Sequence, residues 1–158
     1  MRFVLVTAVA LAATSSAFAA PARDPAKVQP VLKTIATDVD AKALEATIRS
    51  LIGFGTRHTL SDTTSDTRGI GAARRWTAAR FAAISKDCGG CLMVETPSKT
   101  FTGKRAPNGV EIVDVLGIQH GTTDPDRVVI IAGHIDSRVN DVMDAITDAP
   151  GANDDASG

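Results

Sequence analysis

The chain has 158 residues, of which 44% are hydrophobic and 22% charged, the composition of an ordinary globular protein. Its 17 Lys and Arg residues and 18 Asp and Glu residues give a formal net charge of −1. Binding to nucleic acid requires a basic face, so this balance argues against a nucleic-acid partner, and the length is enough for one domain.

Residues 1–19 have the features of a secretory signal peptide. Arg2 is basic, an apolar stretch of about ten residues follows, and Ala17-Phe18-Ala19 gives a small-residue cleavage pattern. A transmembrane helix is the alternative, but the apolar run is shorter than the ~20 residues that a bilayer needs. We therefore predict an exported protein, secreted or periplasmic, with no membrane segment once the signal is removed.

The next segment, residues 20–39, is predicted to be an extended lead-in because it is rich in proline, with a short helix around Val31 to Thr37. An ordered region is predicted to begin at Asp40, which can cap a helix that runs to about Ile52. Gly53 follows as the stop signal. The apolar residues of this helix recur at helical spacing: Leu44, Ile48, Leu51 and Ile52.

Residues 56–68 are rich in Thr, Ser and Asp and are predicted to form a loop, which could border a substrate cleft. Arg57 and His58 lie in this loop, and a role as structural anchors is favoured over contact with substrate. A second helix is predicted over residues 69–86, with Trp76 on its apolar side and in the core.

Cys88 and Cys91 follow this helix with two glycines between them. A C-x-x-C pair can be redox-active, metal-binding or structural. A thioredoxin-type pair stands at the start of a helix, and a structural zinc site needs four ligands, whereas this pair offers two. In an exported protein we predict a local disulfide.

Strands are predicted at residues 92–96 and 110–118, with a turn at Pro107-Asn108-Gly109 before the second. After another turn at 121–126, the β-branched run Val128 to Ile131 is typical of a strand buried on both faces of a sheet. The expected fold class is α/β, a mixed central sheet flanked by helices.

Candidate metal ligands follow this last strand. His134 and Asp136 come directly after it, and Asp154 and Asp155 lie in a Gly-flanked loop further on. Ligands bind at the carboxyl ends of strands in α/β sheets, and imidazole with carboxylates suits a zinc-class ion. The alternative is that His134 is a hydrogen-bonded core histidine and the Asp pair a solvated turn with a helix cap.

The motif H-x-D at 134–136 with G-A-N-D-D-x-S-G at 151–158 resembles the metal-binding signature of the family-twenty-eight metallopeptidases, the di-zinc aminopeptidases. Residues 54–59 and 69–76 resemble two further stretches of that family. The resemblance implies a zinc-exopeptidase fold of the phosphorylase/hydrolase-like type, with residues 40–158 as the N-terminal part of the catalytic domain. The fold would be incomplete at its C-terminus.

The resemblance also implies roles for individual residues. His134 would be a ligand of one zinc ion, and Asp154 would bridge both ions of a two-zinc site. Asp136, the candidate catalytic residue, would be the hydrogen-bond partner that orients His134. The general base and the remaining ligands of the family would lie beyond Gly158, so that this chain would be a fragment without its general base and inactive by itself.

The implied activity is removal of N-terminal residues from peptides by metal-activated water, with peptides that have a free N-terminus as the substrates. One alternative is an acyltransferase similar to the glutaminyl cyclases, which share the fold but use one zinc ion. Their loop typically lacks the second acidic residue, so Asp155 after Asp154 favours the peptidase. Another alternative is a non-catalytic binding module. The oligomeric state and the preferred N-terminal residue stay open.

Overall fold

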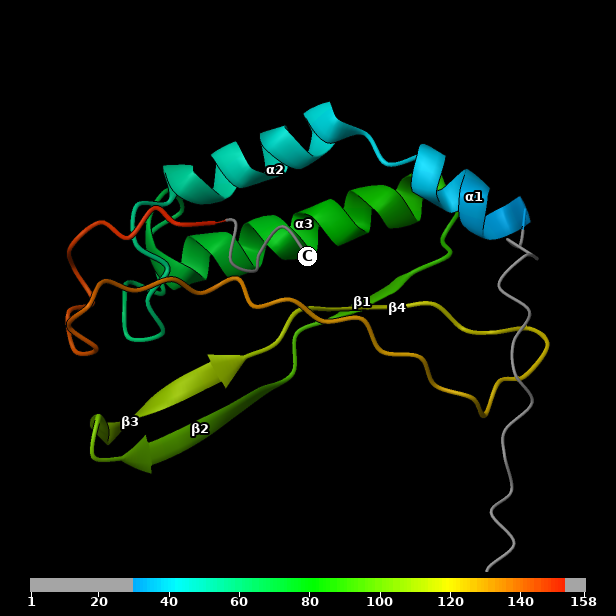
Figure 1. The fold of residues 1–158 in the computed structure, drawn as a ribbon. Coiled ribbons are helices and arrows are strands. Elements are labelled where there is room, and N and C mark those ends of the chain that lie inside the picture. The colour runs from blue at the N-terminus through cyan, green and yellow to red at the C-terminus, as the bar shows by residue number, and fades with distance from the viewer. Residues whose placement is uncertain (1–29, 153–158) are drawn as a thin grey trace, which may run out of the picture. The chain divides into compact units, whose positions relative to one another are not determined.

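The structure, a computed structural model, describes residues 30–152. The predicted signal peptide and the acidic pair Asp154-Asp155 therefore lie outside the described residues. The chain divides into two compact units, Met1–Val39 and Asp40–Gly158. In the first unit, α1 (Pro30–Thr37) is the predicted short helix (Figure 1). None of its residues is buried. Among residues 30–152, every helix is too short or too polar to span a bilayer.

The second unit begins with α2 (Ala41–Gly53), which confirms the predicted helix and its cap. The Asp40 carboxylate accepts a hydrogen bond from the Lys42 N–H at 2.8 Å, as an N-cap residue does. Leu51 near the C-terminal end is buried, whereas Leu44 and Ile52 are each 43% exposed. The helix therefore packs through its last turn, which leads directly into the 54–68 segment.

The long helix α3 (Gly69–Asp87) also forms where the sequence predicts it. Its first five residues, 69–73, are all buried, and the preceding loop caps them. Ser61 Oγ accepts from the Ile70 N–H at 2.9 Å, and the Asp62 carbonyl accepts from the Gly71 N–H at 3.1 Å. The start of α3 is therefore held by the loop rather than by a capping side chain of its own.

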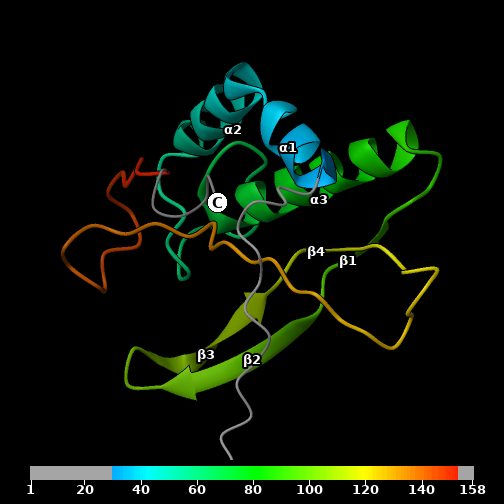
Figure 2. The ribbon, with the colours of Figure 1, turned by 45° about the vertical axis from the view of Figure 1, so that its right-hand side comes forward.

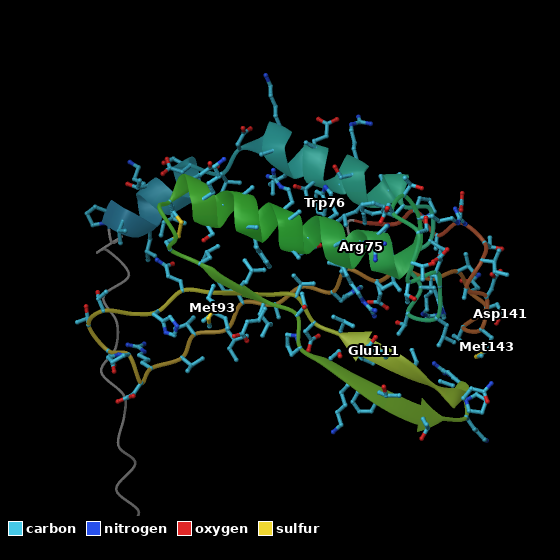
Figure 3. The ribbon with its side chains drawn as sticks, turned by 180° about the vertical axis from the view of Figure 1, so that it is seen from behind. Arg75, Trp76, Met93, Glu111, Asp141 and Met143 are labelled. Atoms are coloured by element: carbon cyan, nitrogen blue, oxygen red, sulfur yellow. A yellow bond between two sulfur atoms is a disulfide. The ribbon has the colours of Figure 1, made fainter. Side chains whose placement is uncertain are left out.

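Trp76 lies on the side of α3 that faces α2 (Figure 3), but it is half-buried rather than fully buried as the core prediction expected. Its ring meets Phe54 edge-on, with 6.3 Å between the ring centroids. A shallow hollow lined by both helices leaves part of the indole accessible. After α3, Cys88 and Cys91 are joined by a disulfide, which confirms that prediction.

Two antiparallel strand pairs follow. β1 (Met93–Glu95) pairs with β4 (Leu116–Ile118), and both run beside α3 (Figure 2). The Phe81 ring of α3 covers Gly117 of β4. β2 (Ser98–Gly103) pairs with β3 (Ala106–Val113) in a hairpin. The predicted strand at 92–96 is thus confirmed as β1, and the one at 110–118 is divided between β3 and β4.

The turn predicted at Pro107-Asn108-Gly109 is wrong. The hairpin turns at residues 104–105, and the three residues belong to β3. They form the irregular part of the pairing, because Phe101 pairs with Val110 but Gly103 pairs with Ala106. Gly109 has a φ of +91°, a conformation that favours glycine. The Pro-Asn-Gly signal therefore marks a bulge in this hairpin.

The buried strand predicted at Val128 to Ile131 is also wrong for this structure. These four residues form no strand, and they are 76%, 76%, 82% and 91% exposed. A strand needs a neighbour to hydrogen-bond with, and none of residues 30–152 pairs with this run. The described residues contain helices and two small antiparallel sheets, and the mixed central sheet of the exopeptidase type stays a prediction.

Candidate functional site

His134 and Asp136 contact each other, although they do not lie on a strand. His134 Nδ1 is 3.1 Å from an Asp136 carboxylate oxygen and 3.2 Å from the Asp136 carbonyl oxygen. Both neighbours are acceptors, so a neutral imidazole would carry its proton on Nδ1. This is the contact expected if Asp136 orients His134, and an imidazole held in this way would bind a metal ion through Nε2.

An open cavity of about 590 Å³ lies beside this pair. Two stretches of chain line it: His134 with residues 136–140, and residues 148–151. The second stretch ends three residues before Asp154, which lies outside the described residues. Among residues 30–152 no group of three or more His, Cys, Asp or Glu side chains could hold a metal ion. The described residues thus supply one proposed ligand, His134, with a partner that fits zinc, and both metal roles stay predictions.

Arg57 is the most extensively bonded side chain near this cavity, and it is fully buried. Its Nη1 donates to the Leu51 carbonyl at 2.8 Å and its Nε to the Ile135 carbonyl at 2.7 Å. Its Nη2 donates to the Gly151 carbonyl. Burial lowers the pKa of Arg57, and the nearby Asp136 carboxylate opposes that shift. The anchoring role favoured for Arg57 is confirmed.

His58 anchors the same region. The residue is 7% exposed, and its Nδ1 accepts a hydrogen bond from the Leu60 N–H at 3.0 Å. Nε2 must then carry the proton, and it lies 3.2 Å from the Val142 carbonyl oxygen to which it donates. The ring therefore joins the 56–68 loop to the segment after His134, and the anchoring interpretation holds here as well.

Further contacts join the two stretches of chain. The Arg57 N–H donates to Ser137 Oγ at 3.1 Å, and the Ala149 N–H donates to the Gly55 carbonyl at 3.2 Å. Arg68 donates to the Ile146 carbonyl at 2.6 Å and forms an ion pair with Asp148 at 2.6 Å. The irregular segment from His134 to Gly151 therefore takes its shape from residues 51–68.

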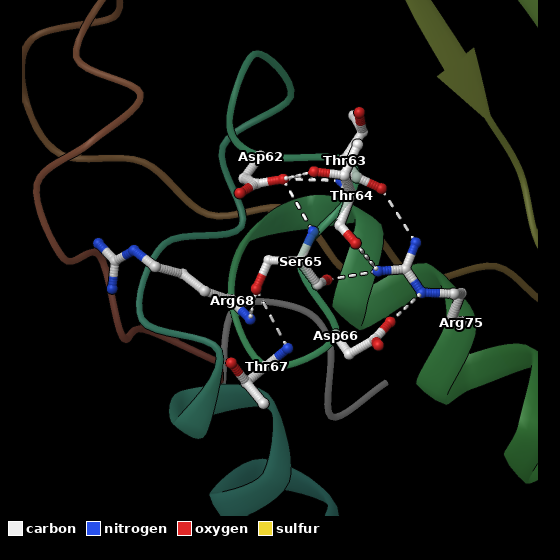
Figure 4. Close-up of polar contacts among 8 residues, drawn as sticks. All are labelled: Asp62, Thr63, Thr64, Ser65, Asp66, Thr67, Arg68 and Arg75. Carbon is white, nitrogen blue, oxygen red and sulfur yellow. Dashed lines mark hydrogen bonds and ion pairs between the residues drawn. The ribbon is translucent and has the colours of Figure 1, made fainter.

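The 62–66 part of the loop is itself held by Arg75 of α3 (Figure 4). The Arg75 guanidinium donates to the carbonyls of Thr63, at 2.9 Å, and of Thr64 and Ser65. Inside the turn, the Asp62 carboxylate accepts from the Ser65 and Thr64 N–H groups at 2.9 and 2.7 Å, which lowers the pKa of Asp62. Hydrogen bonds from within the loop and from Arg75 therefore fix its conformation. No sequence pattern indicated this role of Arg75.

Asp144 makes a similar turn within the segment after His134, and it yields a pH prediction. Its carboxylate accepts from the Thr147 and Ile146 N–H groups, each at 2.9 Å, which lowers its pKa from 3.8 to about 2. A lowered folded-state pKa means that the contribution of Asp144 to stability is complete above about pH 4 and lost as the pH falls through about 2.

We therefore expect Asp144→Ala to reduce the free energy of unfolding at neutral pH and to differ less from the wild type as the solution is acidified. Denaturant unfolding of both proteins between about pH 6 and pH 2 measures this difference. A difference that stays constant over the whole range would show that the ionised carboxylate does not stabilise the turn.

Comparison with known proteins finds relatives over most of the chain. A protein of Pyrenophora teres f. teres is 47% identical over 128 residues, which are 80% of this chain and 26% of the relative. One of Pyricularia oryzae is 48% identical over 122 residues, 77% of this chain and 24% of the relative. One of Phaeosphaeria nodorum is 40% identical over 126 residues, 78% of this chain and 25% of the relative.

Each of these three relatives is named a probable zinc metalloprotease. The chain spans about a quarter of their length. No protein-family model matches the chain, and no solved structure matches it.

Proposed function

We propose that the full-length protein is an exported, zinc-dependent aminopeptidase that removes N-terminal residues from peptides. The observation that carries this proposal is the contact between His134 Nδ1 and the Asp136 carboxylate beside an open cavity. An imidazole with a carboxylate on its second nitrogen is the arrangement found around catalytic zinc. The names of the relatives support zinc and proteolysis, and the aminopeptidase activity is inferred from the 134–158 motif.

His134 would bind one zinc ion through Nε2, while Asp136 keeps the proton on Nδ1 and fixes the ring orientation. Asp154 would supply a carboxylate that bridges two ions. The chemistry that zinc would supply when bound there is a lowered pKa of a water molecule and polarisation of the scissile carbonyl. Residues 136–140 and 148–151 line the space beside His134 in which a peptide end would lie.

Purified full-length protein tests the proposal with three substrates. We expect hydrolysis of aminoacyl-nitroanilides, loss of activity with a chelator and recovery on adding Zn²⁺. An N-acetylated peptide should not be cleaved, because an aminopeptidase requires a free amino group. Cleavage inside the acetylated peptide would indicate an endopeptidase, and cyclisation of an N-terminal glutaminyl peptide would indicate the acyltransferase. Activity that is unaffected by chelation would contradict the zinc assignment.

A further inference from the structure

The guanidinium of Arg57 joins three separate segments of the chain. Its hydrogen bonds go to carbonyls at the end of α2 (Leu51), between the two residues of the His134–Asp136 pair (Ile135), and in the loop before Asp154 (Gly151). Ile135 and Gly151 are 78 and 94 positions away from Arg57 in the sequence. A guanidinium is a rigid planar fork, so atoms that bond to it are held at fixed separations.

The position of Ile135 makes this contact relevant to the site. The carbonyl that accepts from Arg57 Nε lies between the residue proposed to bind zinc and the residue that orients it. The same backbone stretch is held a second time, because the Arg57 N–H donates to Ser137 Oγ at 3.1 Å. Arg57 therefore holds the chain at Ile135 and Ser137, directly after His134.

The chemistry of these hydrogen bonds indicates that Arg57 has a role in addition to stabilising the fold. Arg57 is a fully buried charge whose hydrogen-bond partners are neutral carbonyls, with the Asp136 carboxylate as a nearby opposite charge. Burial of a charge is costly, and apolar packing often stabilises a fold equally well. The directional hydrogen bonds of a guanidinium fix the distance between the segments that they join, which apolar packing does not do.

We propose that Arg57 is a positioning residue of the zinc site, which sets the separation between the His134–Asp136 turn and residues 148–151 on the other side of the cavity. This role rests on the proposed function, because it concerns the placement of His134 as a zinc ligand. Arg57 itself touches neither metal nor substrate. Loss of these hydrogen bonds should leave His134 present but badly placed for the metal ion.

The test uses the full-length protein as wild type, Arg57→Met and Arg57→Lys. The Kd for Zn²⁺ is measured by competition with a chelator, and the absorption spectrum of the Co²⁺-loaded protein reports ligand geometry. We expect Arg57→Met to weaken Zn²⁺ binding by ~10–100-fold, the size seen when outer partners of metal ligands are lost. The Co²⁺ spectrum should change. Arg57→Lys keeps the charge but not the fork, so we expect weakened binding there too.

Arg68→Met is the matched control. Arg68 also holds the segment after His134, through the Ile146 carbonyl and Asp148, but it bonds to neither Ile135 nor Gly151. We expect it to lower the melting temperature of the metal-free protein while the Kd for Zn²⁺ and the Co²⁺ spectrum stay those of the wild type. A purely structural Arg57 would behave in the same way as Arg68.

The outcomes separate this proposal from the function on which it rests. Folded Arg57 variants with wild-type Kd and Co²⁺ spectrum would overturn the positioning role and leave the zinc site intact. If Arg57→Met does not fold, Arg57→Lys decides. A metal-free Arg57→Lys protein that is unfolded would also overturn the role, because Arg57 would then support the fold as a whole. A wild type that does not bind Zn²⁺ would refute the proposed function itself.

Discussion

Replacing Asp154 by asparagine in the full-length protein is expected to abolish hydrolysis of aminoacyl-nitroanilides. A bridging carboxylate would hold two ions at the short separation that two-metal hydrolysis requires, so its loss should disable both at once. His134→Ala should also be severe, because one ligand is removed. Asp136→Asn should cost ~10–100-fold in kcat/KM, because the ligands stay and only the charged partner of His134 Nδ1 is lost.

The order of these three effects is the informative result. Asp126→Asn is the control for the charge change, because Asp126 lies in an exposed turn outside the cavity lining. It should keep the kcat/KM of the wild type. If Asp136→Asn lowered kcat/KM as much as Asp154→Asn, the distinction between an orienting partner and a metal ligand would be contradicted.

Replacing Gly71 by alanine is expected to destabilise the second unit by about 3 kcal/mol, the upper part of the usual range for overpacking. A Cβ on Gly71 would lie 2.6 Å from the Cα of Thr63 and closer still to the Thr63 carbonyl group. These are backbone atoms, and the same carbonyl accepts a hydrogen bond from Arg75. The loop would have to move away from the start of α3, and denaturant unfolding measures the loss.

Gly53→Ala is the matched control for this substitution. Gly53 ends α2, and a Cβ there would meet nothing within 4 Å. Alanine is a better helix former than glycine, so this variant should be as stable as the wild type or more stable by about 0.5–1 kcal/mol. Equal stability of Gly71→Ala and Gly53→Ala would show that the loop does not pack against α3 as the structure has it.

The parts of the fold that local sequence determines were predictable. Helical spacing with a cap at Asp40 predicts α2, and two cysteines separated by two glycines predict the local disulfide. Within the site, the His134–Asp136 contact is also local, since the residues are two positions apart. In each case the interacting groups are neighbours in the chain, so their spacing alone indicates the contact.

Features that depend on distant partners were not predictable. The run Val128 to Ile131 has the composition of a buried strand, but a strand also needs a pairing neighbour, and none of residues 30–152 provides one. Arg57 could be recognised as an anchor but not assigned its partners, because Ile135 and Gly151 lie far along the chain. Nothing in a sequence pattern states which distant carbonyls a buried guanidinium will reach.

The most direct test of the zinc site is the metal content of the full-length protein. Wild type should hold about two zinc ions per chain, His134→Ala about one, and Asp154→Asn almost none, because a bridging ligand serves both ions. Asp136→Asn should stay largely loaded. Full zinc occupancy in Asp154→Asn would contradict the bridging role, and with it the two-zinc interpretation of the segment that begins at His134.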